Sequence, residues 1–191
     1  MKITVTPITE SKRILDKCRL TVNKEPSKNP RPSTLFLDNI YMSEHSPIRE
    51  KLFDIYIEDI PYCISTHFAR HFIGWEKYIT TSRSDRTDIT DRSQRSQMDL
   101  VNMSITANAQ ALIHVANVRM CWCADKDARK VMFEIVKQIK ELEPELGNKL
   151  VPSCIYRGFC SENNKDCGYS REFLSNWRKE YLCGREHLIL D

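Results

Sequence analysis

The sequence predicts one mixed α/β domain, in which short strands and amphipathic helices enclose a single core. Three observations favour this class. The chain opens with a strand, a turn and a helix; apolar residues alternate with charged ones between Leu52 and Ile60; and two later segments carry apolar residues at helical spacing. A chain of 191 residues is long enough for one such domain, and no internal repeat divides it.

Composition excludes two broad classes of protein. The chain is 41% hydrophobic and 29% charged, as expected of a folded globular protein, and no apolar run approaches the roughly 18 residues of a membrane span. The formal net charge of +3 is too small to indicate nucleic-acid binding by itself. Because the first residues lack the apolar stretch of a secretion signal, we expect a cytoplasmic protein with no membrane partner.

The N-terminal third alternates between elements and polar loops. Residues 1–19 predict a strand, a turn and a helix, and the Pro-rich residues 22–34 predict a surface loop. Residues 52–60 predict a half-buried strand. The apolar segment that follows Pro61 could be a strand or a helix.

Helices dominate the rest of the chain. A helix is predicted over residues 100–118, because its apolar residues recur in steps of three and four: Leu100, Met103, Ala107, Ala111, Val115 and Val118. A second helix is predicted from about Ala124 to Leu142, where Pro144 marks its end, and a short one from Ser170 to Leu182.

Three polar residues belong to the first of these helices. At about 100° per residue, Asn108 and Arg119 lie about 20° apart after three full turns, so they share one edge of the helix, whereas His114 points into the apolar stripe. Such residues could bind a ligand together. The alternative is that Arg119 is a solvated charge and His114 a hydrogen-bonded core residue.

A second group of polar residues ends the apolar segment after Pro61. Arg70 and His71 are followed by a polar loop, residues 80–97, that begins with Thr80, Thr81, Ser82 and Arg83. Arginine forks and hydroxyl groups are suited to phosphate. The alternative is a sheet end with a charged, solvated loop.

Motifs of nucleophilic and metal-dependent hydrolysis are missing. The chain has no Gly-x-Ser-x-Gly, no His-Glu-x-x-His and no P-loop, and it has only five glycines. If the protein is an enzyme, a bound cofactor therefore supplies the difficult chemistry.

Eight cysteines are present, and none form a Cys-x-x-Cys pair. We expect free thiols in a reducing compartment and no metal. The alternative is a zinc site in the Cys-rich tail, formed by Cys154, Cys160, Cys167 and Cys183. Residues 1–150 are predicted to form the domain, and residues 151–191 an extension packed on it.

Several of these segments, in this order, resemble the flavin-dependent thymidylate synthases. That family carries Arg-His-Arg followed by Ser-x-Arg, and the chain has Arg70-His71-Phe72 followed by Ser82-Arg83. Upstream, Glu44-His45-Ser46 is similar to the family's Glu-His-x-Ser/Thr segment. Downstream, Asn108, Gln110, His114 and Arg119 resemble the pattern Asn-x-Arg-x-x-x-His-x-x-x-x-Arg. The likeness covers about residues 1–145. Phe72, His67 and Gln110 replace an Arg, a Gln and an Arg of the family.

The resemblance implies roles for individual residues. Residues of three segments would border FAD, those of the helix reaching the flavin of a neighbouring subunit: His45, Arg70, His71, Phe72, Asn108, Gln110 and His114. Others would hold the uridylate: His67, Arg70, Thr80, Ser82, Arg83 and Arg119. Arg119 would be catalytic, because a fixed cation beside the uracil ring stabilises negative charge as C5 becomes nucleophilic.

The resemblance also implies a reaction and a fold. Such enzymes pass a one-carbon unit from 5,10-methylenetetrahydrofolate to C5 of dUMP, with FAD and NADPH and without a protein nucleophile. Their fold is a curved, mainly antiparallel sheet flanked by helices, assembled as a homotetramer with shared active sites.

Two alternatives stay open. One is a flavin- and folate-dependent enzyme that releases a hydroxymethyl pyrimidine or acts on another pyrimidine nucleotide. The other is a non-catalytic relative that binds nucleotide, or single-stranded nucleic acid through Arg83, Arg86, Arg92 and Arg95. Residues 80–97 lack aromatic side chains for base stacking, so no nucleic-acid partner is expected.

Overall fold

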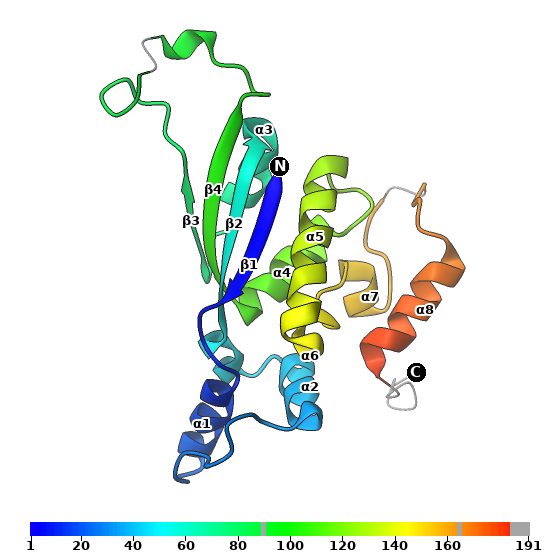
Figure 1. Ribbon diagram of the computed structural model, residues 1–191. Helices are drawn as coiled ribbons and strands as arrows, with labels where there is room; N and C mark the ends of the chain where they lie inside the picture. The colour runs from blue at the N-terminus through cyan, green and yellow to red at the C-terminus, as the bar shows by residue number, and fades with distance from the viewer. Residues whose placement is uncertain (89–90, 164–165, 184–191) are drawn as a thin grey trace.

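The structure is a computed structural model that describes residues 1–88, 91–163 and 166–183, with Arg92 described by its backbone alone. In this part of the chain four strands form one antiparallel sheet (Figure 1). Their order across the sheet is β1 (Lys2–Pro7), β2 (Leu52–Pro61), β4 (Leu100–Asn108) and β3 (Trp75–Ile79). The expected α/β class with an antiparallel sheet is confirmed.

One face of the sheet carries the core. Val5 pairs with Ile55, and Ile55 pairs with Ile105, so these three buried side chains lie in a row across β1, β2 and β4. The next row places Phe53, Ala107 and Trp75 side by side, all with no exposed surface. This alternation is what the period of a half-buried strand requires.

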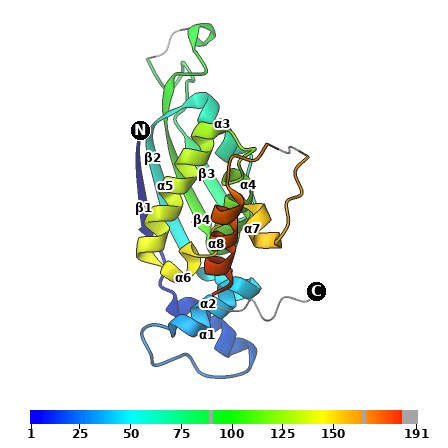
Figure 2. The same cartoon turned by 90° about the vertical axis from the view of Figure 1, so that its right-hand side faces the viewer.

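Helices cover that face, and the other face is open. The helices between and after the strands are α1 (Lys12–Thr21), α2 (Thr34–Ser43), α3 (Tyr62–Ala69), α4 (Ala109–Arg119), α5 (Lys126–Leu142), α6 (Pro144–Gly147), α7 (Ser153–Arg157) and α8 (Arg171–Leu182), with short 3-10 turns η1 (Ser46–Glu50) and η2 (Arg92–Gln94). Figure 2 shows α5 lying along the sheet, with α7 and α8 outside it and α1 and α2 at one end.

The helix predicted over residues 100–118 is wrong in its first half. Residues 100–108 are strand β4, and α4 begins only at Ala109. Alternate residues of β4 are buried, whereas the residues between them are polar: Asn102, Ser104, Thr106 and Asn108. Pairing with β2 and β3 decides the conformation, because a period of two buries one complete face.

Two expectations about the helix change with it. Asn108 caps α4 at its N-terminus, and Arg119 is the last residue of α4, so the two mark its ends. His114 is exposed and does not enter the apolar stripe. The buried side of α4 contains Leu112, Ile113 and Ala116, so residue 114 falls on the opposite side.

The other predicted elements are confirmed to within a few residues. The segment after Pro61 is helix α3, and residues 80–88 and 91–97 form an irregular connection apart from η2. No helix in the described ranges has both the length and the apolarity of a membrane span.

The tail packs against the helices through buried groups. Lys149, which is 1% exposed, forms an ion pair with Asp38 of α2 (Nζ–Oδ1 2.7 Å) and donates to the carbonyl of Tyr181 in α8 (3.0 Å). Tyr169 donates to the carbonyl of Met120, which holds the segment before α8 against the end of α4. A buried lysine of this kind ties α2 and α8 to one point.

Candidate functional site

The link between α3 and β3 meets the end of α4. His71 lies in this link, and its ring Nε2 accepts a hydrogen bond from Arg119 Nε (3.1 Å). Its carbonyl accepts from Lys77 Nζ (2.7 Å). Trp75 packs edge-on against the imidazole, with ring centroids 5.9 Å apart, and anchors itself by donating to Phe68 O. The chain thus brings together an imidazole and a guanidinium that are 48 residues apart.

His71 is held in its neutral form. Burial lowers its pKa to about 4, and the nearby charges of Arg119 and Lys77 contribute to the same shift. Since Nε2 accepts from Arg119, the proton of the neutral ring is on Nδ1. The site therefore contains a positioned, uncharged imidazole at neutral pH.

Cations without carboxylate partners surround this imidazole. Burial lowers the pKa of Arg119, and the positive charge of Arg70 lowers it further. Among the described residues, none of the ion pairs involves Arg70, Lys77 or Arg119. Like charges gathered without a counterion favour binding of an anion.

Gly74 makes a close approach that positions the start of α4. Its φ of +66° is in the left-handed region, and a Cβ there would lie 2.2 Å from Asn108 Nδ2. Asn108 N donates to Gly74 O (3.0 Å), and Asn108 Oδ1 accepts from Ala111 N (2.8 Å). The link that carries His71 is therefore tied to the helix that carries Arg119.

A second polar group lies on the exposed side of α4. Gln110 donates through Nε2 to Glu44, and the same nitrogen is 3.4 Å from His114 Nε2. The Glu44 carboxylate is 3.7 Å from His114 Nε2, and its interaction with Tyr156 of α7 raises the pKa of Tyr156 to about 12. His45 is exposed beside Glu44 at the start of η1.

The predicted phosphate loop lies at the other end of β3. Thr80 and Ser82 line a small pocket of about 130 Å³ together with Arg95, and Arg83 forms a two-bond contact with Asp85 (2.9 and 2.8 Å). The five residues of β3 separate this loop from His71 by about 16 Å of extended chain. The loop and the His71–Arg119 contact therefore lie at opposite ends of β3.

The remaining predicted site residues lie near His71. His67 is half-buried in the last turn of α3, and Phe72 is 70% exposed next to the 80% exposed Ile73. Large apolar side chains beside unpaired cations are typical of a surface that binds another molecule.

The cysteines give no preformed metal centre. All eight are free thiols, and the described residues contain no group of three or more potential ligands that could hold a metal ion. Burial raises the pKa of Cys154, and the neighbouring Cys160 and Cys167 raise it further. Cys183 instead contacts Lys149 Nζ (3.4 Å), so the four thiols of the zinc alternative do not face one another.

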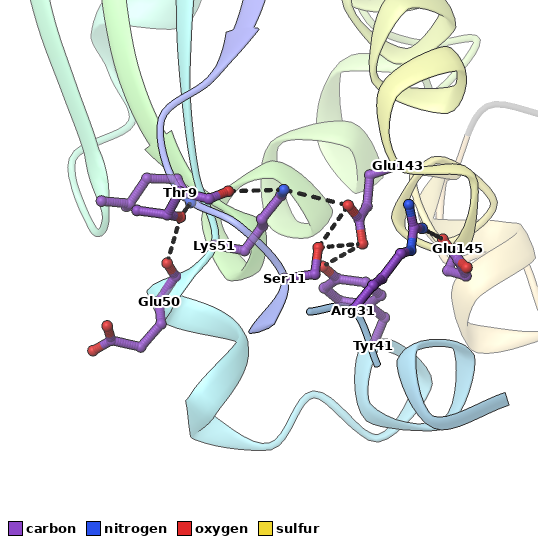
Figure 3. Close-up of polar contacts among 9 residues, drawn as sticks. Thr9, Ser11, Arg31, Tyr41, Glu50, Lys51, Glu143 and Glu145 are labelled. Carbon is purple, nitrogen blue, oxygen red and sulfur yellow. Dashed lines mark hydrogen bonds and ion pairs between the residues drawn. The ribbon is translucent and has the colours of Figure 1, made fainter. Parts of the chain in front are cut away.

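A separate cluster of buried polar groups surrounds Glu143, just after the end of α5, and the sequence gives little sign of it. Figure 3 shows Glu143 accepting from Ser11 and Tyr41 and pairing with Lys51 (3.3 Å), which also donates to Thr9 O. A neighbouring cavity of about 540 Å³ lies between the β1–α1 turn and the end of α5. Because these buried groups satisfy one another, they join the N-terminal segment to the end of α5.

Three residues of the two sites were not foreseen as such. In the sequence Glu44 stands out only as part of the segment around His45, and Lys77 and Tyr156 have no signal beyond their residue type. Lys77 shares the covered face of the sheet, opposite Ile105, and its stem carries the amine back to His71. Only the folded chain makes these contacts.

Comparison with known proteins shows a shared fold. No known family profile matches the sequence, and no characterised relative matches it. Among solved structures, a UMP/dUMP methylase, PolB from Streptomyces cacaoi bound with 5-Br dUMP, is similar with a TM-score of 0.59 and 12% identity, covering 83% of this chain and 96% of that one. The same methylase bound with 5-Br UMP gives 0.53 and 13%, covering 78% and 93%. The chain therefore has the fold of a UMP/dUMP methylase.

Proposed function

We propose that this protein transfers a one-carbon unit to C5 of a uridine nucleotide, converting dUMP to dTMP. The observation that carries the proposal is the carboxylate-free group of Arg70, Lys77 and Arg119 around the neutral His71. Its positive charge suits an anionic nucleotide. The fold shared with a methylase that binds bromouridylates supports the same substrate class.

Arg119 has the geometry of the principal catalytic residue. Its Nε is fixed by His71, and none of the hydrogen bonds among the described residues uses its two terminal nitrogens, which leaves them for a ligand. A guanidinium held in this way stabilises the negative charge that develops on a uracil ring when N3 loses its proton and C5 becomes nucleophilic. Because His71 is neutral, it orients Arg119 without adding charge.

The proposal includes FAD, NADPH and 5,10-methylenetetrahydrofolate. Residues of the first half of α4 and of the α3–β3 link suit a flat, polar ring: Asn108, Gln110 and His114 offer amide and imidazole groups, and Phe72 offers an exposed aromatic face. When bound, FAD would supply the electrons of the reductive step. The protein's part is to bind the rings, orient them and exclude water.

The proposed site is shared between copies of the chain. Thr80, Ser82 and Arg83 follow β3 at the end of the strand away from the His71–Arg119 contact. A neighbouring protomer that supplies this loop would complete the site, as in a homotetramer with shared active sites.

The deciding experiment combines a spectrum with product analysis. We expect purified protein to be yellow, or to become so with added FAD, and the flavin absorbance to change when dUMP binds. With dUMP, the folate donor, FAD and NADPH, mass spectrometry should detect dTMP. A hydroxymethyl product would contradict the methylase proposal and favour the hydroxymethylase alternative. Colourless protein that takes up no FAD would contradict both.

The Arg119→Ala variant tests the mechanism. Turnover should be lost while flavin absorbance is retained, because the guanidinium acts on the nucleotide ring and not on FAD. Equal turnover in variant and wild type would remove Arg119 from the mechanism.

The binding-only alternative has weaker support. Arg83 and Arg86 both pair with Asp85, and Arg95 pairs with Asp99, which neutralises much of the loop's charge. The side chain of Arg92 lies outside the described structure. Oligonucleotide binding that falls steeply with salt, without FAD binding, would favour this alternative.

A further inference from the structure

Glu44 joins three helices at one point. It follows α2 in the left-handed conformation (φ 50°), which is uncommon for a residue with a side chain, and its side chain is 14% exposed. Its carboxylate meets Gln110 and His114 of α4 and Tyr156 of α7. A nearly buried carboxylate therefore lies directly behind an exposed part of α4.

The carboxylate decides which way the Gln110 amide points. An ionised carboxylate only accepts hydrogen bonds, so Gln110 must turn its NH2 group toward Glu44. The second amide hydrogen lies toward His114 Nε2, 3.4 Å away. Both donors are thereby used, and within the described ranges nothing pairs with Gln110 Oε1, which remains an acceptor.

The same arrangement decides the tautomer of His114. Its Nε2 accepts from Gln110, so the neutral ring carries its proton on Nδ1. The His114 side chain is 64% exposed, and no described residue accepts from Nδ1. Gln110 and His114 are one helical turn apart, so α4 presents one acceptor and one donor side by side.

Tyr156 holds the carboxylate in place. The interaction with Glu44 is the largest cause of the raised pKa of Tyr156, about 12, followed by burial, so the hydroxyl and the carboxylate lie near each other. With Gln110 on one side and Tyr156 on the other, Glu44 has little freedom to rotate away.

We propose that Glu44 is a positioning residue that fixes Gln110 and His114 as an acceptor–donor pair for the imide edge of a ligand ring. Gln110 Oε1 accepts from the ring N–H, and His114 Nδ1–H donates to the adjacent carbonyl. Both uracil and the pyrimidine ring of a flavin have this edge. The identity of the ligand rests on the proposed function. The orientation of Gln110 and the tautomer of His114 do not depend on it.

The first test needs no ligand. In ¹⁵N spectra of wild-type protein at neutral pH, His114 should be the Nδ1–H tautomer. In the Glu44→Gln variant, which has nearly the same shape but can both donate and accept, His114 should shift toward Nε2–H. The Glu50→Gln variant, which alters a surface pair with Arg13, is the matched control and should resemble wild type. A wild-type Nε2–H tautomer, or no change in Glu44→Gln, would overturn the proposal.

The second test identifies the ring. FAD and 3-methyl-FAD form one pair of probes, and dUMP and 3-methyl-dUMP the other. The ring that uses this edge should bind to wild type about five- to tenfold more tightly than its methylated form, as one neutral hydrogen bond implies. Glu44→Gln should lose this preference, whereas Glu50→Gln should keep it.

The two tests separate the possible failures. Equal binding of methylated and parent forms in both pairs would overturn the imide assignment. If neither parent binds, the proposed function and the ligand assignment fail together, whereas the tautomer result still supports the positioning role of Glu44.

Discussion

At the scale of single residues, His71 combines three constraints that lower the affinity of its ring for a proton. It is half-buried, it accepts from Arg119, and Lys77 lies on its other side. Together they lower its pKa from 6.5 to about 4. In the folded protein the ring therefore stays neutral over a range in which a free histidine takes up a proton.

This shift predicts how stability depends on pH. Between pH 6.5 and about 4, the unfolded chain binds a proton at His71 that the folded chain does not. The free energy of unfolding should therefore fall as the pH is lowered through this window and be unaffected by His71 above it. After discounting for the half-exposed ring, the loss is about 1–2 kcal/mol.

The His71→Gln variant checks this dependence by urea unfolding at several pH values. The amide keeps an acceptor for Arg119 but does not titrate, so the variant's stability should vary less between pH 6.5 and 4. Equal slopes in the two proteins would contradict the prediction.

At the scale of elements, the junction of β4 and α4 explains the main error of the sequence analysis. Residues 100–118 contain an apolar series at helical spacing and, within it, an alternating series that ends at Asn108. Both the helical and the alternating pattern are present in the sequence. Only pairing with β2 and β3 shows which applies, because local periodicity does not reveal distant partners.

A double-variant experiment tests the contact that fixes this junction. Gly74→Ala should lower the free energy of unfolding by at least about 2 kcal/mol, because its Cβ overlaps Asn108 and its φ is positive. In an Asn108→Ser background, where the smaller residue still caps α4, the same change should cost only about 1 kcal/mol. Equal costs in both backgrounds, measured by urea unfolding, would show that the overlap does not matter.

Elements with one clear pattern were predicted well. Helix α5 has a single amphipathic stripe, an Asp125 cap and Pro144 immediately beyond its end, and β2 alternates without ambiguity apart from a bulge near Asp59. Local signals agree with the tertiary packing in both cases, and the sequence alone is then sufficient.

At the scale of the whole molecule, the predicted uridylate site is divided. Sequence motifs predict both halves of this site, but a linear pattern does not show that β3 lies between them. The contacts of Glu44, Lys77 and Tyr156 also cannot be predicted from the sequence, because each joins side chains from separate elements.

Mixed assemblies test whether two chains complete one site. Arg119→Ala and Arg83→Ala should each be inactive alone. Co-expressed, they should recover about a quarter of wild-type activity, because random assembly gives that share of sites both arginines. Activity assays of separately tagged, co-purified chains measure this. If neither variant alone loses activity, or if the hybrid stays inactive, the shared site is wrong.

The long connection between β3 and β4 has an evolutionary consequence. The chain leaves the sheet after Ile79 of β3 and returns at Leu100 of β4, and the described residues in between contribute almost nothing to the buried core. Doubling the length of such a loop lowers the free energy of unfolding by only about 0.6 kcal/mol, through the entropy of loop closure. Natural or engineered insertions here should therefore diversify substrate preference while the scaffold keeps its fold.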